Sequence, residues 1–173
     1  MTNFKLCVAI SGSGTLLQRM ITKGLDISLV VADRHCEGLA FAETAFIPAI
    51  VLNRAEFGWT PEHGWDDDPI HQIISPERTA FTLALAGALV QHDITLFAMA
   101  GFDVILPEQF FQTMRGRLIT NSHPALLPTF KGPGHAVVDA ALAAGVKYTG
   151  TTIHVANLDL DSGPIIDQGV VRV

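Results

Sequence analysis

The sequence predicts an α/β fold in which an open, mostly parallel sheet carries helices on both faces. Short apolar runs alternate along the chain with segments whose apolar residues recur every three or four positions. This alternation indicates strands joined by helical crossovers, which set consecutive strands in parallel and cover both faces of the sheet. With 173 residues, 49% of them hydrophobic, the chain is long enough to bury one substantial core. We therefore expect a single domain over residues 1–173.

The first strand and helix are joined by a glycine-rich turn. The apolar run 4–10 ends at Ser11-Gly12-Ser13-Gly14-Thr15, and apolar residues then recur at helical spacing over 16–21. Glycines let the chain turn tightly and bring backbone N–H groups to the start of the helix, where an anion such as phosphate is favoured. The alternative is an ordinary turn in which Ser13 or Thr15 caps the helix.

The remaining elements follow from the same two periodicities. The longest helix has a clear start, because Ser75 can cap it while Pro76 and Glu77 suit its first turn. The other predicted helices cover 37–46, 107–114 and 136–144, and the longest runs to about residue 91. The predicted strands are 4–10, 27–33, 49–52, 94–100, 118–120, 151–155 and 165–173.

Residues 54–74 interrupt this alternation. They contain two tryptophans, two prolines and the acidic run Asp66-Asp67-Asp68, which together indicate a long surface loop. His63, His71 and the aspartates lack a compact metal-ligand spacing such as H-E-x-x-H. A solvated acidic loop is therefore favoured over a metal site, and we expect no metal in this protein.

Composition limits the kinds of partner. The formal net charge is −6 and the sequence pI about 5.5, and no stretch concentrates Lys and Arg. Nucleic acid and anionic membrane surfaces are therefore disfavoured, and small molecules are the expected partners. No apolar run approaches the length of a bilayer crossing, so we expect a cytoplasmic protein. The two cysteines, Cys7 and Cys36, are expected to be reduced thiols rather than a disulfide.

The strongest chemical signal is Asn121-Ser122-His123-Pro124, which directly follows the strand predicted at 118–120. Asn121 supplies a neutral amide donor, and His123 is the side-chain type that titrates near neutral pH. Carried at the carboxyl end of a strand, where open α/β sheets bind ligands, the two side chains could bind a developing oxyanion. The alternative is that both are turn residues whose side chains satisfy local backbone groups.

A dinucleotide-binding oxidoreductase is a second hypothesis. Gly12-Ser13-Gly14 follows a strand, and Asp33 ends the next strand at a distance suitable for contacting a ribose. The third glycine of that fingerprint is replaced by Leu17, so the match is weak.

Four segments, taken in order, resemble the folate-dependent formyltransferases. They are Ser11-Gly12-Ser13-Gly14, Ala98-Met99-Ala100-Gly101-Phe102, Asn121-Ser122-His123-Pro124-Ala125-Leu126-Leu127-Pro128 and Leu160-Asp161-Ser162-Gly163-Pro164. The paired N-x-H-P-x-L-L-P and L-D-x-G-P elements are specific, and the resemblance spans nearly the whole chain. It implies a Rossmann-like formyltransferase fold. It also implies transfer of a formyl group from 10-formyltetrahydrofolate to the amine of a small phosphorylated substrate, such as glycinamide ribonucleotide in purine biosynthesis.

The resemblance assigns catalysis to Asn121, His123 and Asp161. Attack of an amine on the formyl carbon creates an oxyanion, which the Asn121 amide and a protonated His123 could bind. Asp161 could pair with His123 and accept, directly or through water, the proton of the attacking amine. No metal is needed for this chemistry.

The resemblance also implies binding residues. For the folate they are Gly101, Phe102, Asp103, Val104, Ile105 and Leu106, together with Asn157 and Asp159. For the phosphate of the amine substrate they are Gly12, Ser13, Gly14 and Thr15.

Three departures from the family pattern concern the acceptor and the length of the chain. The family's phosphate loop reads G-N-G-S-N-L, whereas here both asparagines are replaced, and Gly132-Pro133-Gly134-His135-Ala136 differs from the usual histidine-containing segment. The sequence also stops at Val173, so we expect a catalytic domain shortened at its C-terminus. A relative with another amine acceptor, a formyl-folate hydrolase and a non-catalytic folate-binding protein remain alternatives. A homodimer is possible.

Overall fold

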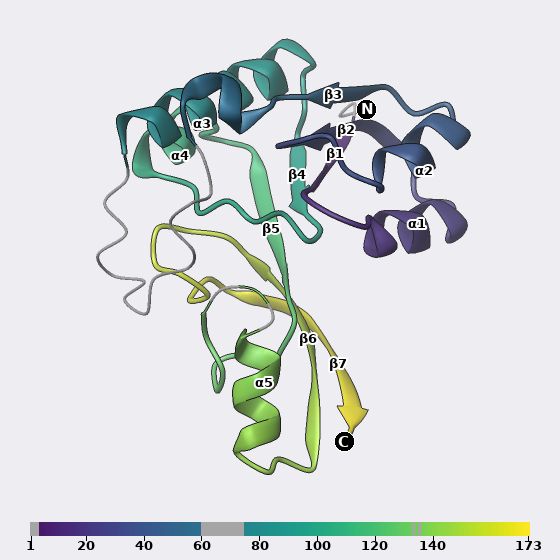
Figure 1. The fold of residues 1–173 in the computed structure, drawn as a ribbon, viewed down its shortest axis with the longest axis vertical. Coiled ribbons are helices and arrows are strands. Elements are labelled where there is room, and N and C mark those ends of the chain that lie inside the picture. Colours follow the sequence, from purple (N-terminus) through teal and green to yellow (C-terminus); the bar gives the residue numbers. More distant parts are fainter. Residues whose placement is uncertain (1–3, 60–74, 133, 135) are drawn as a thin grey trace. The chain divides into compact units, whose positions relative to one another are not determined.

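The computed structural model describes residues 4–59, 75–132, 134 and 136–173 of the chain. These residues form two compact units, 1–118 and 119–173 (Figure 1). The single domain expected over 1–173 stays a prediction, because a division by contact density does not decide whether the two units fold together.

The first unit is built on four parallel strands with the order β3-β2-β1-β4. The strands are β1 (Leu6–Ile10), β2 (Ile27–Ala32), β3 (Ala49–Val51) and β4 (Leu96–Met99). The helices are α1 (Thr15–Thr22), α2 (Leu39–Thr44), the 3-10 helix η1 (Arg54–Phe57), α3 (Pro76–Gln91) and α4 (Glu108–Thr113). Every strand and α-helix predicted for this part of the chain is confirmed, with ends that differ by a few residues.

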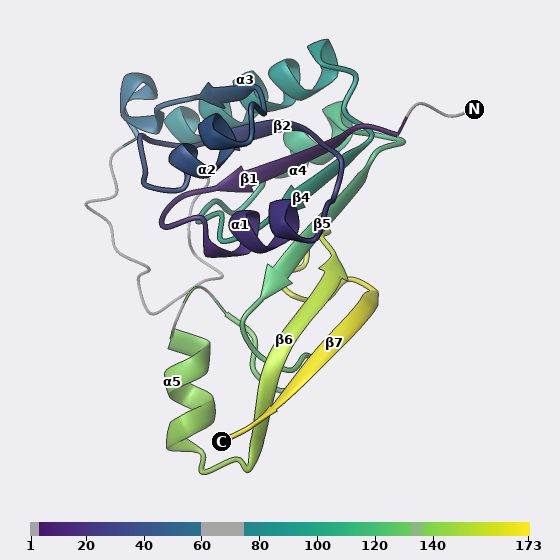
Figure 2. The same cartoon turned by 90° about the vertical axis from the view of Figure 1, so that its right-hand side faces the viewer.

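Strand β1 lies at the centre of the first core. All five of its residues are buried, as expected for a strand covered on both faces. Leu6, Val8 and Ile10 pack on one face with Leu17 of α1. On the other face the ring of Phe97 in β4 lies 5.8 Å from that of Phe110 in α4. Figure 2 shows α1 and α3 on opposite sides of these strands.

The predicted loop at 54–74 was partly wrong, because Arg54–Phe57 forms the 3-10 helix η1. The Asn53 side chain caps this helix by accepting the N–H of Ala55, and the guanidinium of Arg54 is buried in an ion pair with Asp33. Residues 60–74, with His63, Asp66–Asp68 and His71, lie outside the described residues. The predicted start of α3 is confirmed, since the Ser75 hydroxyl accepts the N–H of Arg78 at 3.2 Å.

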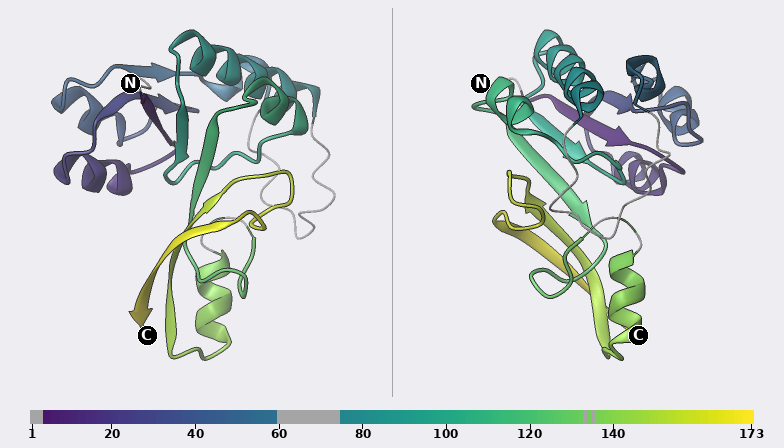
Figure 3. Two further views of the ribbon diagram at one scale, coloured as in Figure 1. Left: turned by 180° about the vertical axis from the view of Figure 1, so that it is seen from behind. Right: turned by 60° about the vertical axis from the view of Figure 1, so that its left-hand side comes forward.

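The second unit is antiparallel. It contains β5 (Leu118–His123), α5 (Ala136–Ala143), β6 (Tyr148–Val155) and β7 (Ile165–Arg172). β6 pairs with both β5 and β7, and α5 lies alongside the β6–β7 hairpin (Figure 3). The expectation that the strand at 118 ends at Thr120 was wrong, because β5 pairs with β6 as far as His123 opposite Thr152. Asn121 and His123 are therefore strand residues rather than turn residues.

Among the helices that the structure describes, none has both the length and the hydropathy that a bilayer crossing requires.

Candidate functional site

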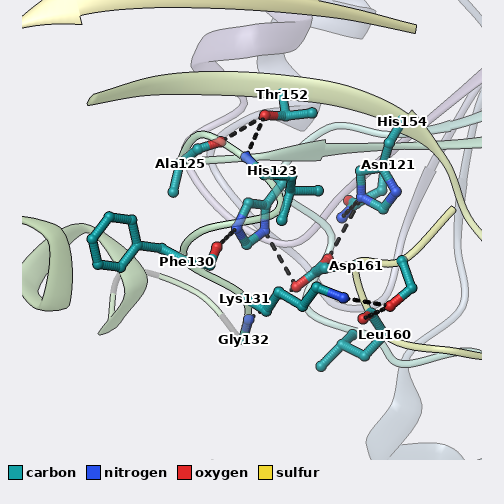
Figure 4. A network of polar contacts seen from close by, with 12 residues as sticks. Asn121, His123, Ala125, Phe130, Lys131, Gly132, Thr152, His154, Leu160 and Asp161 are labelled. Atoms are coloured by element: carbon teal, nitrogen blue, oxygen red, sulfur yellow. Dashed lines mark hydrogen bonds and ion pairs between the residues drawn. The ribbon is translucent and has the colours of Figure 1, made fainter. Parts of the chain in front are cut away.

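Strands β5 and β6 bring three polar side chains to one face of the second unit. Asn121 and His123 are two residues apart in β5 and so point to the same face. His154 of β6 is the register partner of Asn121, which puts its ring on that face as well. Asn121 Nδ2 lies 3.2 Å from His154 Nε2, and the rings of His123 and His154 meet edge to face (Figure 4).

Asp161 reaches this face from the loop between β6 and β7. Its backbone has a positive φ of 51°, a conformation that Asp tolerates better than most residues. Gly163 makes the tight loop possible, because a Cβ at this position would collide with the carbonyl oxygen of Val155. This contact gives a physical reason for the glycine in the L-D-x-G-P element.

The Asp161 carboxylate is buried and faces two imidazoles. Oδ2 lies 3.4 Å from His123 Nδ1, and Oδ1 lies 3.5 Å from His154 Nε2 (Figure 4). Oδ2 also accepts the backbone N–H of Gly132 at 3.0 Å. Burial raises the pKa of Asp161, but the contact with His154, the Gly132 N–H and the charges of both histidines outweigh it and lower this pKa below its ordinary value. Asp161 is therefore ionised at neutral pH.

Both ring nitrogens of His123 face oxygen acceptors. Nε2 lies 2.7 Å from the carbonyl oxygen of Phe130, which can only accept a hydrogen bond, so Nε2 carries a proton. Nδ1 faces the ionised carboxylate of Asp161. An imidazolium protonated on both nitrogens satisfies both contacts, as a charge-assisted pair between two buried groups.

His154 is a member of the site that no sequence motif predicted. Its Nδ1 lies 3.1 Å from the carbonyl oxygen of Val155, while Nε2 faces both Asn121 and Asp161. Neutral His154 with its proton on Nδ1 accepts the Asn121 amide N–H, whereas protonated His154 donates to Asp161. Only the antiparallel register of β6 against β5 reveals this residue, and no local sequence signal specifies that register.

Threonine side chains of β6 hold the segment that follows His123. The buried Thr152 hydroxyl donates to the Ala125 carbonyl at 2.7 Å and accepts the Leu127 N–H at 3.1 Å. The Thr151 hydroxyl donates to the His123 carbonyl at 3.0 Å. Further along the same segment, Lys131 Nζ donates to Ser162 Oγ at 2.7 Å.

The glycine turn and the segment after β4 lie side by side in the first unit. Ser11 donates its N–H to the Gly101 carbonyl at 2.9 Å, and its hydroxyl accepts the Asp103 N–H at 2.8 Å. Two groups of sequence-predicted residues are thus brought together here: Gly12, Ser13, Gly14 and Thr15, and Gly101, Phe102, Asp103, Val104, Ile105 and Leu106.

The alternative in which Ser13 or Thr15 caps α1 was wrong. Gly14 occupies the cap position with a φ of 67°, and in the described part of this unit no side chain caps the helix. The hydroxyls of Ser13 and Thr15 instead lie 3.1 Å from each other. A Cβ on Gly14 would lie 2.5 Å from the Cα of Gly38, so the turn requires glycine for close backbone packing.

Asp33 is engaged in ion pairs and is not available to a ribose. Its side chain is fully buried; Arg34 contacts both of its oxygens, at 3.1 and 2.9 Å, and Arg54 contacts Oδ2 at 3.1 Å. Together with Leu17 in place of the third glycine, this arrangement argues against a dinucleotide-binding oxidoreductase.

The cysteines lie in unreactive surroundings. Cys7 and Cys36 are free thiols, and burial raises the pKa of both. Within the described ranges, no group of three or more His, Cys, Asp or Glu side chains could hold a metal ion. Asn157 and Asp159 are exposed in the loop that carries Asp161.

Comparison with known proteins gives a consistent picture. The family model described as formyl transferase matches residues 4–173. Phosphoribosylglycinamide formyltransferase from Mycobacterium tuberculosis is 34% identical over 174 residues, which cover 98% of this chain and 71% of the relative. The trifunctional purine biosynthetic protein adenosine-3 of Gallus gallus is 36% identical over 177 residues, covering 98% of this chain and 16% of that protein.

Among solved structures, glycinamide ribonucleotide transformylase 1 from Symbiobacterium toebii is similar with a TM-score of 0.80 and 32% identity. The match covers 98% of this chain and 74% of that one. This likeness confirms the fold class predicted from the sequence.

Proposed function

Because this chain belongs to the formyl transferase family, we propose that it transfers the formyl group of 10-formyltetrahydrofolate to the amine of glycinamide ribonucleotide, a step of purine biosynthesis. The observation that carries the proposal is the buried cluster of Asn121, His123 and Asp161 on one face of the second unit. The cluster combines an amide donor, an imidazolium donor and an ionised carboxylate, which formyl transfer to an amine requires.

In the proposed reaction the amine nitrogen attacks the formyl carbon. A C–N bond forms, and the carbonyl π electrons move to oxygen to give a tetrahedral oxyanion. Asn121 Nδ2 and the protonated His123 are the donors that stabilise this oxyanion. Collapse of the intermediate breaks the bond to N10 of the folate, which leaves as tetrahydrofolate with one proton.

His123 must exchange a partner during this reaction. Its Nδ1 is held by Asp161 and its Nε2 by the Phe130 carbonyl, so the oxyanion replaces that carbonyl at Nε2. The carboxylate of Asp161 keeps the ring protonated and oriented. Because the pKa of Asp161 is lowered, the carboxylate acts mainly through its charge, and it accepts the amine proton through a water only as that proton becomes acidic in the intermediate.

The binding assignments belong to the same proposal. Gly101–Leu106, with Asn157 and Asp159, bind the folate, and Gly12–Thr15 bind the phosphate of the acceptor. Support for the phosphate site comes from the glycine turn at the start of the eight-residue helix α1, whose free N–H groups favour an anion. A cytoplasmic location and a homodimer are further proposals, and light scattering coupled to size-exclusion chromatography tests the dimer.

A product assay tests the proposed function. The protein is incubated with 10-formyltetrahydrofolate and glycinamide ribonucleotide, and formylated amine, formate and tetrahydrofolate are measured by mass spectrometry. We expect formylated ribonucleotide and tetrahydrofolate in equal amounts. Formate in place of the formylated amine would identify a hydrolase, and donor binding without turnover of any amine would identify a non-catalytic folate-binding protein.

A further inference from the structure

A buried arginine lies against the segment to which folate binding is assigned in the first unit. Arg78 belongs to the first turn of α3, and its side chain is almost completely buried. Its Nε donates to the carbonyl oxygen of Ile105 at 3.0 Å. Burying a guanidinium is unfavourable unless it makes good hydrogen bonds, so this contact holds both partners in place.

A tryptophan covers the same guanidinium. Arg78 Cζ lies 5.4 Å from the ring centroid of Trp59, and Arg54 Cζ lies 5.0 Å from it. The ring also packs against Phe81 of α3, with 5.4 Å between centroids. Arg54 is in turn fixed by its ion pair with Asp33. Trp59 therefore has contacts that restrict its movement, and cation–π attraction keeps the Arg78 guanidinium beside it.

The segment held by Arg78 has no regular secondary structure of its own. Residues 102–107 lie between β4 and α4 outside any helix or strand. Two contacts fix the backbone of the segment from opposite ends: the Asp103 N–H donates to Ser11 Oγ, and the Ile105 carbonyl accepts from Arg78. Without the second contact, the peptide plane after Ile105 would be free to rotate.

The direction of that peptide plane matters for a ligand. In a trans peptide, the carbonyl of one residue and the N–H of the next point in opposite directions. Because the Ile105 carbonyl points to Arg78, the Leu106 N–H points away from α3. The contact with Arg78 thus turns a backbone donor of the assigned folate segment away from the helix.

We propose that Arg78 is a positioning residue for folate binding: it orients the Ile105–Leu106 peptide so that the Leu106 N–H donates to the pterin ring, and Trp59 holds Arg78 in place. This inference rests on the proposed function. It adds a residue outside the assigned binding segment, and it predicts that the contribution of Arg78 is specific to the formyl donor.

The test measures donor binding and turnover separately in Arg78→Met and Arg78→Lys. A matched control is Arg117→Met, since Arg117 Nε also donates to a backbone carbonyl, that of Ile94, at 2.9 Å. Calorimetric titration with 10-formyltetrahydrofolate alone gives the dissociation constant, and steady-state kinetics give the KM of each substrate. We expect Arg78→Met to raise the donor Kd and KM by about tenfold or more, with the acceptor KM unchanged within about twofold.

Arg78→Lys keeps the charge but loses the planar fork, so we expect it to raise the donor Kd nearly as much as Arg78→Met does. Arg117→Met is expected to bind the donor like the parent protein. An unchanged donor Kd in Arg78→Met, or equal increases in the Arg78 and Arg117 variants, would overturn the inference. So would parallel increases in the KM of both substrates, which a general loss of structure would cause.

A second pair of variants keeps the test valid if Arg78→Met does not fold. Trp59→Leu removes the aromatic face and should weaken donor binding, whereas Trp59→Phe keeps one and should weaken it less. Equal donor binding by these two variants and the parent would contradict the role of Trp59. A parent protein that binds no donor would refute the proposed function itself, whereas normal binding by both parent and Arg78→Met refutes only the role of Arg78.

Discussion

The carbonyl oxygen of Phe130 lies 2.7 Å from Nε2 of His123 and so occupies the nitrogen to which we assign the oxyanion. The next two residues also reach the loop of Asp161, through Lys131 Nζ to Ser162 and through the Gly132 N–H to Asp161. Three consecutive residues of one segment thus depend on the candidate catalytic groups for their position.

The order of this segment should therefore depend on the Asp161 carboxylate. In Asp161→Ala the Gly132 amide loses its acceptor, and we expect its hydrogen exchange to accelerate by about tenfold or more. Exchange followed by NMR gives the rate, and the Ala156 amide, which donates to Ile119, serves as an internal control. Unchanged exchange at Gly132 would show that the segment is held by other contacts.

Asn121→Ala should slow the chemical step. Loss of one oxyanion donor typically costs about 10²- to 10³-fold in kcat, and we expect a decrease of that order with little change in the donor KM. Asn53→Ala is a suitable control, because Asn53 caps η1 in the other unit. A kcat within about twofold of the parent would remove Asn121 from the oxyanion site.

The lowered pKa of Asp161 predicts how stability depends on pH. The folded protein favours the ionised carboxylate, so this stabilisation is present above the ordinary carboxyl pKa of about 4 and is lost as the pH falls through the lower pKa of the folded state. Urea unfolding of the parent and Asp161→Ala should show a difference in unfolding free energy at pH 6 that shrinks toward pH 3. A difference that stays constant over this range would contradict the assigned direction.

Gly163→Ala should destabilise the second unit, because the added Cβ collides with the Val155 carbonyl. Overpacking of this kind costs about 1–3 kcal/mol, measured as a shift in the urea midpoint. Gly87→Ala is the matched control: Gly87 lies in α3, where an added Cβ would meet open space, so this substitution should gain about 0.5–1 kcal/mol. Equal effects of the two substitutions would contradict the steric explanation.

Periodicity and turn chemistry predicted the first unit well. Local signals suffice there, since buried parallel strands are continuous apolar runs and helices such as α3 carry their own caps at Ser75 and Pro76. The antiparallel second unit was harder, because the pairing of β5 with β6 joins residues far apart in sequence. The sequence therefore predicted β5 to end at Thr120, three residues too early.

The same distinction holds for the candidate site. Asn121, His123 and Asp161 are predicted from their motifs, and the structure brings them together with distances that fit ion pairing and hydrogen bonding. His154 and the Phe130 carbonyl are not predicted because neither belongs to a motif; strand register brings one and chain reversal brings the other. The sequence places Arg78 in a helix and no more, since burial of a guanidinium has no signal in sequence.

The central claim is that the Asp161–His123 pair performs formyl transfer. Its most direct test is the single-turnover rate of formylated glycinamide ribonucleotide formation at saturating 10-formyltetrahydrofolate in the parent, Asp161→Asn and Asp167→Asn. Asp167 is an exposed aspartate of β7 in the same unit and serves as the matched control. We predict a rate lower by about 10²- to 10⁴-fold in Asp161→Asn and a parental rate in Asp167→Asn. A parental rate in Asp161→Asn would contradict the claim.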